Sequence, residues 1–354
     1  MGQEISNPGR RALITGVTGQ IGSYLAELLL KRGYEVHGIV RRNSFVGAAR
    51  SRIDHLGDLK LHHGDICDAS SLNDIIHRVR PDEVYNLAAQ SHVWISFQVP
   101  EHTCDVDALG ALRVCDAARR MDKPVRVYQA STSELFGGIY NYPVNEETPF
   151  HPRSPYGVAK QFAHWTMINH REAYGMFCSN GIVFNSESPR RGENFVTRKI
   201  TKELAAIVRG KKEKMFLGNL NARRDWNHAK DSAESMRLIL QAEKPWDYVI
   251  ASGEAHSVRE FAEMAFRCAG IELGWRGEGL DEVGYDVKTG RERIGVNPFY
   301  FRPSEVDVLI GDSSKAKKEL GWKPSYSFGD IVEEMVEYDL NGGNEHGSFT
   351  SRDS

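Results

Sequence analysis

Short and almost wholly apolar segments recur along the first half of the chain. They lie at residues 11–15, 34–40, 59–63, 83–88, 125–130 and 182–184. Segments of this kind are typical of strands that are buried on both faces of a sheet. Helical stretches fall between them, at 22–32, 70–79, 103–121 and 155–174. Alternating strands and helices predict a parallel sheet with right-handed crossovers.

The pattern changes after about residue 180. Helices are predicted at 195–209, 228–242, 257–269 and 327–340, among mixed strands and loops. The Gly-rich, polar segment 274–298 predicts a loop or an excursion of a substrate domain, and the apolar-poor end, 341–354, predicts a flexible tail. We therefore predict an α/β fold: a doubly wound parallel sheet at 11–185 with a smaller mixed α/β C-terminal lobe in the remainder of 186–340. Segments near 215–245 and 297–312 are expected to return to the first lobe.

Composition and charge narrow the class of protein. The 354 residues suffice for one large domain or two lobes, and a net charge of -3 provides no basic surface for nucleic acid. No apolar run approaches the roughly eighteen residues that cross a bilayer, and the polar N-terminus does not have the pattern of a signal peptide. The five cysteines include no C-x-x-C pair, which favours a reducing compartment. We expect a cytoplasmic protein that binds neither membrane nor nucleic acid, and no histidine spacing indicates a metal site.

A glycine-rich turn follows the first predicted strand and opens the first predicted helix. Its residues are Gly16-Val17-Thr18-Gly19-Gln20-Ile21-Gly22. Glycines permit a tight turn and a close approach of the backbone to a pyrophosphate, and the helix N-terminus offers unpaired N–H groups. An ordinary turn is the alternative, but the strand–turn–helix context favours a dinucleotide site of the Rossmann type. The predicted contacts are Gly16, Thr18, Gly19, Gln20, Ile21 and Gly22.

The end of the second strand bears on the choice between NAD and NADP. Arg41 and Arg42 stand there, and a guanidinium accommodates the 2′-phosphate of NADP. We predict NADP with Arg41 as a contact, and a solvated basic loop is the alternative. Small and polar residues at the ends of the third and fourth strands predict further cofactor contacts, although turns also use such residues. These are Asp65, Ile66, Leu87, Ala88, Ala89, Gln90 and Ser91.

Two clusters carry the candidate chemistry, one at Ser131-Thr132-Ser133-Glu134 and one at Tyr156 to Lys160. Residues four apart on a helix face the same way, so the Lys160 ammonium is expected to lie beside the Tyr156 phenol. This neighbour is expected to lower the pKa of Tyr156, which makes Tyr156 a base for a sugar hydroxyl. Glu134 adds a second base that simple alcohol oxidation does not need. The alternatives are an exposed Tyr–Lys pair on a helix and an acid at a helix N-terminus.

The order of these motifs resembles the extended short-chain dehydrogenases that act on nucleotide sugars. The shared features are the glycine loop, Leu87-Ala88-Ala89, Thr132 and the Tyr156/Lys160 pair. Longer segments are similar to the GDP-mannose 4,6-dehydratase family in particular. They are residues 130–137, 154–160, 188–192, 195–200, 217–220, 223–226, 301–303 and 320–324, and the resemblance extends from about residue 11 to residue 340.

This resemblance implies an activity and a set of roles. The activity is conversion of GDP-mannose to GDP-4-keto-6-deoxymannose by internal hydride transfer from C4 to C6 with loss of water. The resemblance also implies an NADP-dependent enzyme that forms a homodimer or homotetramer, with the loop after Arg41 at a subunit contact. The implied catalytic residues are Thr132, Ser133, Glu134, Tyr156 and Lys160, of which Tyr156 and Lys160 also contact the cofactor, as does Arg191. The implied residues of the GDP-sugar site are Ser91, Asn185, Glu187, Val196, Lys199, Leu217, Gly218, Arg224, Arg302 and Glu305.

Three positions depart from the family pattern. Ile21, His102 and Ser186 stand where the family usually has Asp, Tyr and His. They leave room for a related substrate such as GDP-manno-heptose. A nucleotide-sugar epimerase or decarboxylase with the same fold stays open as an alternative, although Glu134 disfavours the simple epimerases. A non-catalytic NADP-binding sensor also stays open, although it would not need all four reactive residues together.

Overall fold

The structure is a computed structural model that describes residues 9–42, 52–301, 306 and 308–343. Its first lobe is built on a seven-stranded sheet with the order β10-β6-β5-β4-β1-β2-β3, and every neighbouring pair is parallel. Six of these strands have the Rossmann order 3-2-1-4-5-6, which confirms the predicted fold class. The strands are β1 (Arg11–Thr15), β2 (Glu35–Val40), β3 (Lys60–His63), β4 (Glu83–Asn86), β5 (Arg126–Thr132), β6 (Cys178–Val183) and β10 (Tyr248–Ile250).

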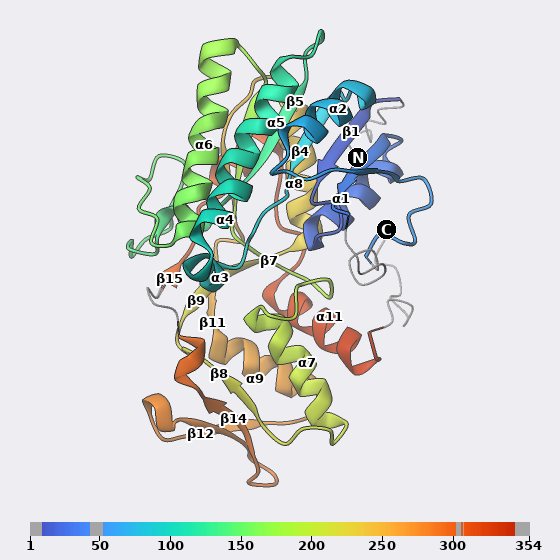
Figure 1. Ribbon diagram of the computed structural model, residues 1–354. Helices are drawn as coiled ribbons and strands as arrows, with labels where there is room; N and C mark the ends of the chain where they lie inside the picture. The colour runs from blue at the N-terminus through green and yellow to red at the C-terminus, as the bar shows by residue number, and fades with distance from the viewer. Residues whose placement is uncertain (1–8, 43–51, 302–305, 307, 344–354) are drawn as a thin grey trace.

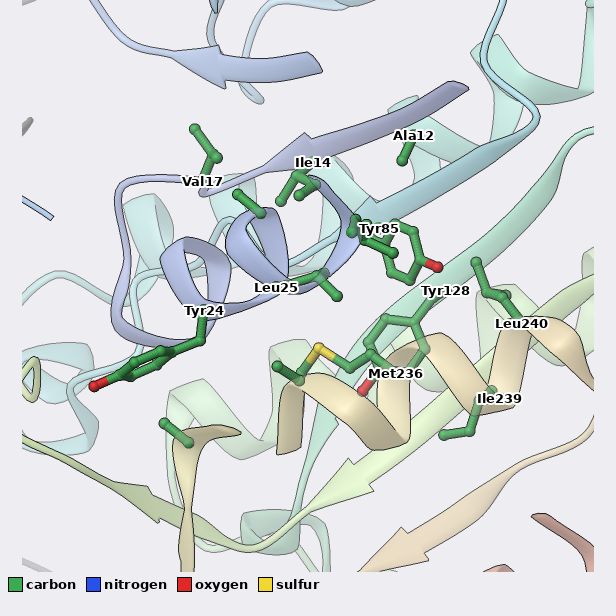
Figure 2. Close-up of a cluster of buried hydrophobic side chains, with 14 of the residues drawn as sticks. Ala12, Ile14, Val17, Tyr24, Leu25, Tyr85, Tyr128, Met236, Ile239 and Leu240 are labelled. Atoms are coloured by element: carbon green, nitrogen blue, oxygen red, sulfur yellow. The ribbon is translucent and has the colours of Figure 1, made fainter. Parts of the chain in front are cut away.

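Helices cover both faces of this sheet. One apolar cluster joins α1 and α8 to the strands, and Figure 2 shows Leu25 of α1 and Met236 of α8 directed toward Tyr85 and Tyr128 of the sheet. A second cluster joins the opposite face to α2, α5 and α6. The helices of this lobe are α1 (Gln20–Lys31), α2 (Ala69–Val79), α3 (Val93–Gln98), α4 (Pro100–Cys104), α5 (Gly110–Arg119), α6 (Pro155–Tyr174), α8 (Ala229–Gln241) and α10 (Ser314–Leu320). Among all the residues that the structure describes, no helix is both long and apolar enough to cross a membrane.

The second lobe lies at one end of the first (Figure 1). Its core packs α7 (Val196–Val208), α9 (Val258–Cys268) and α11 (Phe328–Leu340) around Phe261 and Phe266, which are fully buried. One four-stranded sheet contains β12 (Leu273–Arg276), β13 (Val283–Asp286), β14 (Glu292–Val296) and β8 (Met215–Leu217). Another links the lobes through β7 (Asn185–Glu187), β9 (Arg223–His228), β11 (Ala255–Ser257) and β15 (Val308–Leu309).

The domain limits stay a prediction. Within the expected returning segment 215–245, β8 pairs with β14 of the second lobe, whereas α8 packs against α1 of the first. The chain thus crosses between the lobes inside that segment. The tail 344–354 lies outside the described residues.

Two elements differ from their predicted form. Segment 274–298, predicted as a loop or a substrate-domain excursion, holds most of three strands, and Gly277 and Gly290 turn the chain with φ of +75° and +71°. Its many glycines and polar residues hide these short strands from pattern analysis. The helix predicted at 103–121 is interrupted by a π-helical segment, η1 (Asp105–Leu109), between α4 and α5. Short 3-10 turns occur at η2 (Ser133–Phe136), η3 (Gly279–Asp281) and η4 (Pro298–Tyr300).

Candidate active site

The glycine loop lies against the end of β4. Gly16 has a φ of +70°, and a Cβ there would stand 2.8 Å from the backbone nitrogen of Ala88. A Cβ on Gly22 would stand 2.3 Å from the carbonyl oxygen of Gly16. Only glycine permits this close packing, which leaves the N-terminus of α1 facing the edge of the sheet without a side-chain cap. The loop therefore fits a dinucleotide pyrophosphate.

A second feature of the loop supports this fit. Gln20 donates from Nε2 to the carbonyl oxygen of Ser186, 2.9 Å away, so the loop is tied to the segment that follows β6. Its amide oxygen, Oε1, is buried and has no hydrogen-bond partner among the residues that the structure describes. A buried acceptor without a donor is unfavourable. Gln20 thus carries unused hydrogen-bonding capacity in the predicted cofactor loop.

Buried polar side chains hold the strand ends in place beneath the loop. The Thr15 hydroxyl donates to Asn86 Oδ1 at 2.6 Å, and Asn86 Nδ2 donates to Gln129 Oε1 at 2.7 Å. Thr15 Oγ1 also accepts from the backbone N–H groups of Leu87 and Ala88. Sequence reasoning missed this network, although a polar residue near the end of each of three apolar strands was its signal.

The residues that the sequence predicts to be reactive, and that are called the reactive residues below, come from β5 and α6. Thr132 ends β5, and its Oγ1 accepts from the backbone N–H of Glu134 in η2 at 3.3 Å. Ser154 caps α6 by accepting from the backbone N–H of Gly157 at 3.0 Å, which places Tyr156 in the first helical turn. Lys160 donates from Nζ to the carbonyl oxygen of Ala130 at 3.1 Å and so ties α6 to β5. All four reactive side chains are buried at this strand end.

The charges around Tyr156 differ from the expected effect of Lys160. The pKa of Tyr156 is raised, because its burial and the negative charges of Asp107 and Glu134 outweigh a hydrogen bond from Thr132 and the charge of Arg191. The predicted net lowering of this pKa is therefore wrong for the protein by itself, because burial and the two carboxylates raise it. Lys160 Nζ lies 5.8 Å from the centre of the Tyr156 ring, and burial lowers the pKa of Lys160 itself.

Asp107 is a functional candidate that sequence reasoning missed. It is 2% exposed, and its charge acts on both Tyr156 and Lys160. The signal was an acid on the apolar stripe of the predicted helix 103–121, four residues before Ala111 and seven before Val114.

A charged cluster joins the start of α7 to the segment after β7. The carboxylate of Glu187 is buried, it accepts from the hydroxyl of Thr197, and its Oε2 lies 3.3 Å from Arg191 Nε. Burial raises the pKa of Glu187, and Arg191 and Thr197 oppose that rise. The Arg191 guanidinium stacks 3.7 Å from the centre of the Phe195 ring. Arg191 also acts on Tyr156, so this cluster reaches the reactive side chains.

The other predicted residues of the GDP-sugar site lie in the second lobe or at its border. Lys199 on α7 donates to the carbonyl oxygen of Phe216 at 2.6 Å, and a Cβ on Gly218 would stand 2.8 Å from the carbonyl oxygen of Tyr300. Arg224 donates to the carbonyl oxygen of Val306 at 2.6 Å, so its buried guanidinium supports the backbone there. Asn185 begins β7, Val196 begins α7 and Leu217 ends β8, whereas Arg302 and Glu305 lie outside the described residues. These roles stay predictions.

The predicted cofactor contacts on the other side of the loop follow β2 and β3. Arg41 is exposed directly after β2. Asp65 follows β3, and its Oδ1 accepts from the backbone N–H of Cys67 at 2.9 Å. Arg52 donates to the carbonyl oxygen of Thr18 at 3.3 Å. Within the described ranges, no group of three or more His, Cys, Asp and Glu residues is placed to hold a metal ion.

A Rossmann sheet, a glycine loop and a buried Thr–Glu–Tyr–Lys cluster at the end of β5 define a short-chain dehydrogenase of the extended type, with a second lobe over the strand ends. Comparison with known proteins identifies the branch. The family model for GDP-mannose 4,6 dehydratase matches residues 13–335. The chain belongs to the GDP-mannose 4,6-dehydratase family, which confirms the predicted family, enzyme class and dehydratase function.

Individual relatives agree with this assignment. The GDP-mannose 4,6 dehydratase of Drosophila melanogaster is 55% identical over 350 residues, covering 96% of this chain and 88% of the relative. The human protein of that name is 53% identical, with 95% and 93% covered, and the GDP-mannose 4,6-dehydratase of Vibrio cholerae serotype O1 is 52% identical, with 95% of each covered.

Solved structures show the same fold at lower identity. The dTDP-glucose 4,6-dehydratase of Streptomyces venezuelae, solved with NAD bound, has a TM-score of 0.78 at 24% identity, covering 94% of this chain and 98% of that one. The UDP-glucose 4-epimerase of Thermotoga maritima has a TM-score of 0.79 at 23% identity, with 94% and 99% covered. These likenesses support the two-lobed fold.

Proposed function

We propose that this chain converts GDP-mannose to GDP-4-keto-6-deoxymannose with a nicotinamide cofactor that stays bound. The observation that carries the proposal is the buried cluster of Thr132, Glu134, Tyr156 and Lys160 at the end of β5, beside the glycine loop. Family membership supports the substrate. Besides the Tyr156 phenol, the site contains a second base, the Glu134 carboxylate, and a second base suits a reaction with an elimination step.

The residues of the cluster divide the proton transfers between them. Bound beside the glycine loop, the cofactor supplies a reversible hydride acceptor and, when oxidised, a positive charge that favours the Tyr156 phenolate. Tyr156 takes the proton of the sugar 4-hydroxyl, and Thr132 hydrogen-bonds the same oxygen. Lys160 stabilises the phenolate with its ammonium group. Burial of all these groups keeps water away from the reacting sugar.

Glu134 carries the step that distinguishes a dehydratase from a simple dehydrogenase. A ketone at C4 acidifies the proton on C5, and the Glu134 carboxylate removes it. The C5–H electrons form the C5–C6 double bond while the C6 hydroxyl leaves as water, with a proton delivered by Glu134 or Ser133. The hydride that left C4 would then be returned to C6, and C5 would regain a proton, which gives the 6-deoxy product. The proton that Tyr156 took from the 4-hydroxyl balances the proton that C5 regains. Glu134 lies two residues beyond Thr132 on the same turn, so both steps use one site.

The test is Glu134→Gln, with Glu147→Gln on an exposed loop as the matched control. We expect Glu134→Gln to lower formation of the 4-keto product by about 100-fold or more, because a general base is lost, while cofactor affinity is kept. Mass spectrometry should follow loss of one water from GDP-mannose, GDP-manno-heptose and a UDP-sugar. Near wild-type product from Glu134→Gln would refute the role of Glu134. Turnover of GDP-manno-heptose alone would replace the proposed substrate.

We infer that the cofactor is NADP. Arg41 and Arg42 are exposed directly after β2, where a 2′-phosphate would lie in a Rossmann site. Arg41→Ala should weaken NADP binding by about 10- to 100-fold and leave NAD binding unchanged, because only NADP has the extra phosphate. Calorimetry with each nucleotide measures this, with Arg78→Ala on α2 as the control. Equal affinities of the wild-type protein for NAD and NADP would contradict the inference.

We also propose a homodimer formed through α6. Val158, Phe162 and Trp165 lie at positions i, i+4 and i+7 of this helix and are 54%, 46% and 54% exposed. An exposed apolar stripe on a long helix suits a symmetric contact with a second copy. Phe162→Glu should yield monomers in light scattering, whereas Val208→Glu on α7 should not. A Phe162→Glu protein with unchanged mass would rule out this interface.

Two related expectations, on a tetramer contact and on the cellular location, stay predictions. A tetramer contact at the loop after Arg41 falls on residues 43–51, which lie outside the described residues. The cytoplasmic location rests on the cysteine pattern, and all five cysteines are free thiols.

A further inference from the structure

Asp107 is a buried carboxylate that the proposed mechanism does not use. It is 2% exposed and lies in the π-helical segment η1, a rare form that is frequent at functional sites. Its Oδ1 accepts from the backbone N–H of Gln90 at 2.8 Å. Its Oδ2 is also buried and has no hydrogen-bond partner in the described part of the chain. A carboxylate in this state is costly unless an opposite charge lies near it.

The opposite charge that faces Asp107 comes from the reactive cluster. Segment η1 packs against α6, and the charge of Lys160 on α6 acts on Asp107. The other groups that face it are Tyr156 on the same helix, His102 on α4 and the Gln90 backbone after β4. Burial favours the neutral form of Lys160, and Asp107 is the charge that opposes this effect. The two buried groups therefore compensate each other.

We propose that Asp107 is the counter-ion that keeps Lys160 protonated and thereby sets the pH range in which Tyr156 takes the proton of the substrate hydroxyl. The proposal rests on the proposed function, because it gives Tyr156 and Lys160 their roles. Asp107 acts through these residues and is a positioning residue. Its free Oδ2 and its backbone anchor at Gln90 hold the negative charge at one place beside α6.

The sign of the effect follows from the charges. A negative Asp107 makes both the Lys160 ammonium and the Tyr156 phenol harder to deprotonate. When that charge is removed, the pKa of each group falls. Both limbs of a bell-shaped pH–rate profile should then move to lower pH by about 1 unit, the size of shift that a nearby charge produces.

The test compares Asp107→Asn with the wild-type full-length protein by measuring the pH dependence of 4-keto product formation from GDP-mannose. Asparagine keeps an acceptor for the Gln90 N–H. Asp105→Asn is the matched control, since Asp105 lies in the same segment but pairs with Arg113 at 2.7 Å. We expect the profile of Asp107→Asn to move to lower pH by about 1 unit and that of Asp105→Asn to stay in place. Superimposable profiles for Asp107→Asn and wild type would overturn the proposal.

A second measurement does not depend on turnover. In protein labelled with ¹³C at lysine Cε, the Lys160 resonance is assigned by Lys160→Arg and titrated with pH. Its midpoint should fall by about 1 unit in Asp107→Asn, and an unchanged midpoint would overturn the proposal even if GDP-mannose were not the substrate. Asp107→Glu keeps the charge, so its midpoint should stay near that of wild type. A fall of about 1 unit in Asp107→Glu would also refute the assignment, and this arm remains if Asp107→Asn does not fold.

Discussion

Asp107 should weaken the fold near neutral pH, although the proposed reaction needs it. Burial raises the pKa of Asp107 from an ordinary value of 3.8 to about 6, and the charge of Lys160 and the Gln90 N–H only partly oppose the rise. The group therefore releases its proton more readily in the unfolded chain than in the folded one. Its contribution is favourable below about pH 4 and is lost as the pH rises through about 6.

The magnitude follows from the size of this shift. A rise of about two pKa units corresponds to about 3 kcal/mol, an order-of-magnitude value for a group so deeply buried. Asp107→Asn removes the titration. The free energy of unfolding of the variant, minus that of wild type, should therefore increase by up to about 3 kcal/mol between pH 4 and pH 7. Burying the amide adds a cost that does not depend on pH, so the change with pH is the quantity to compare.

Urea unfolding at several pH values, followed by tryptophan fluorescence, measures this change. Asp105→Asn is an informative control because its stability should change with pH in the opposite direction. A hydrogen bond from Arg113 lowers the pKa of Asp105, so the free energy of unfolding of wild type should increase relative to that of Asp105→Asn as the pH rises. Parallel stability curves for wild type and Asp107→Asn between pH 4 and pH 7 would refute the reasoning. They would mean that water or relaxation compensates the buried charge.

Three further predictions concern the loop, the charged cluster and the second core. Gly16→Ala should weaken cofactor binding in calorimetry by at least about 10-fold, because its Cβ would meet the Ala88 backbone and φ is positive; unchanged affinity would contradict the close packing. Thr197→Val removes the hydroxyl that donates to the buried Glu187 and should cost about 1–3 kcal/mol in urea unfolding; a neutral result would indicate that Arg191 alone suffices. Phe261→Ala should cost about 3–5 kcal/mol, because the ring is fully buried in the second lobe; a loss under about 1 kcal/mol would show that this core relaxes around the cavity.

Much of the first lobe could be predicted because its signals are local. Buried parallel strands are short apolar runs, and a helix such as α6 begins at a Ser-Pro cap that the chain itself supplies. The strands in segment 274–298 could not be predicted from the sequence pattern. These strands are only four or five residues long and each contains a glycine, so their formation depends on pairing with β8 and with one another.

The candidate site divides in the same way. By itself, the sequence determined the family and the residue types that the proposed dehydratase reaction requires. The glycine loop, Thr132, Glu134 and the Tyr156/Lys160 pair can be recognised as motifs in the sequence alone. Only the tertiary structure decided the electrostatic state of that site. Packing of η1 against α6 brings Asp107 toward Tyr156 and Lys160, and burial then raises the pKa of the phenol that local spacing predicted to be lowered. Desolvation and long-range charge depend on what surrounds a group in space, and spacing along the chain does not specify that.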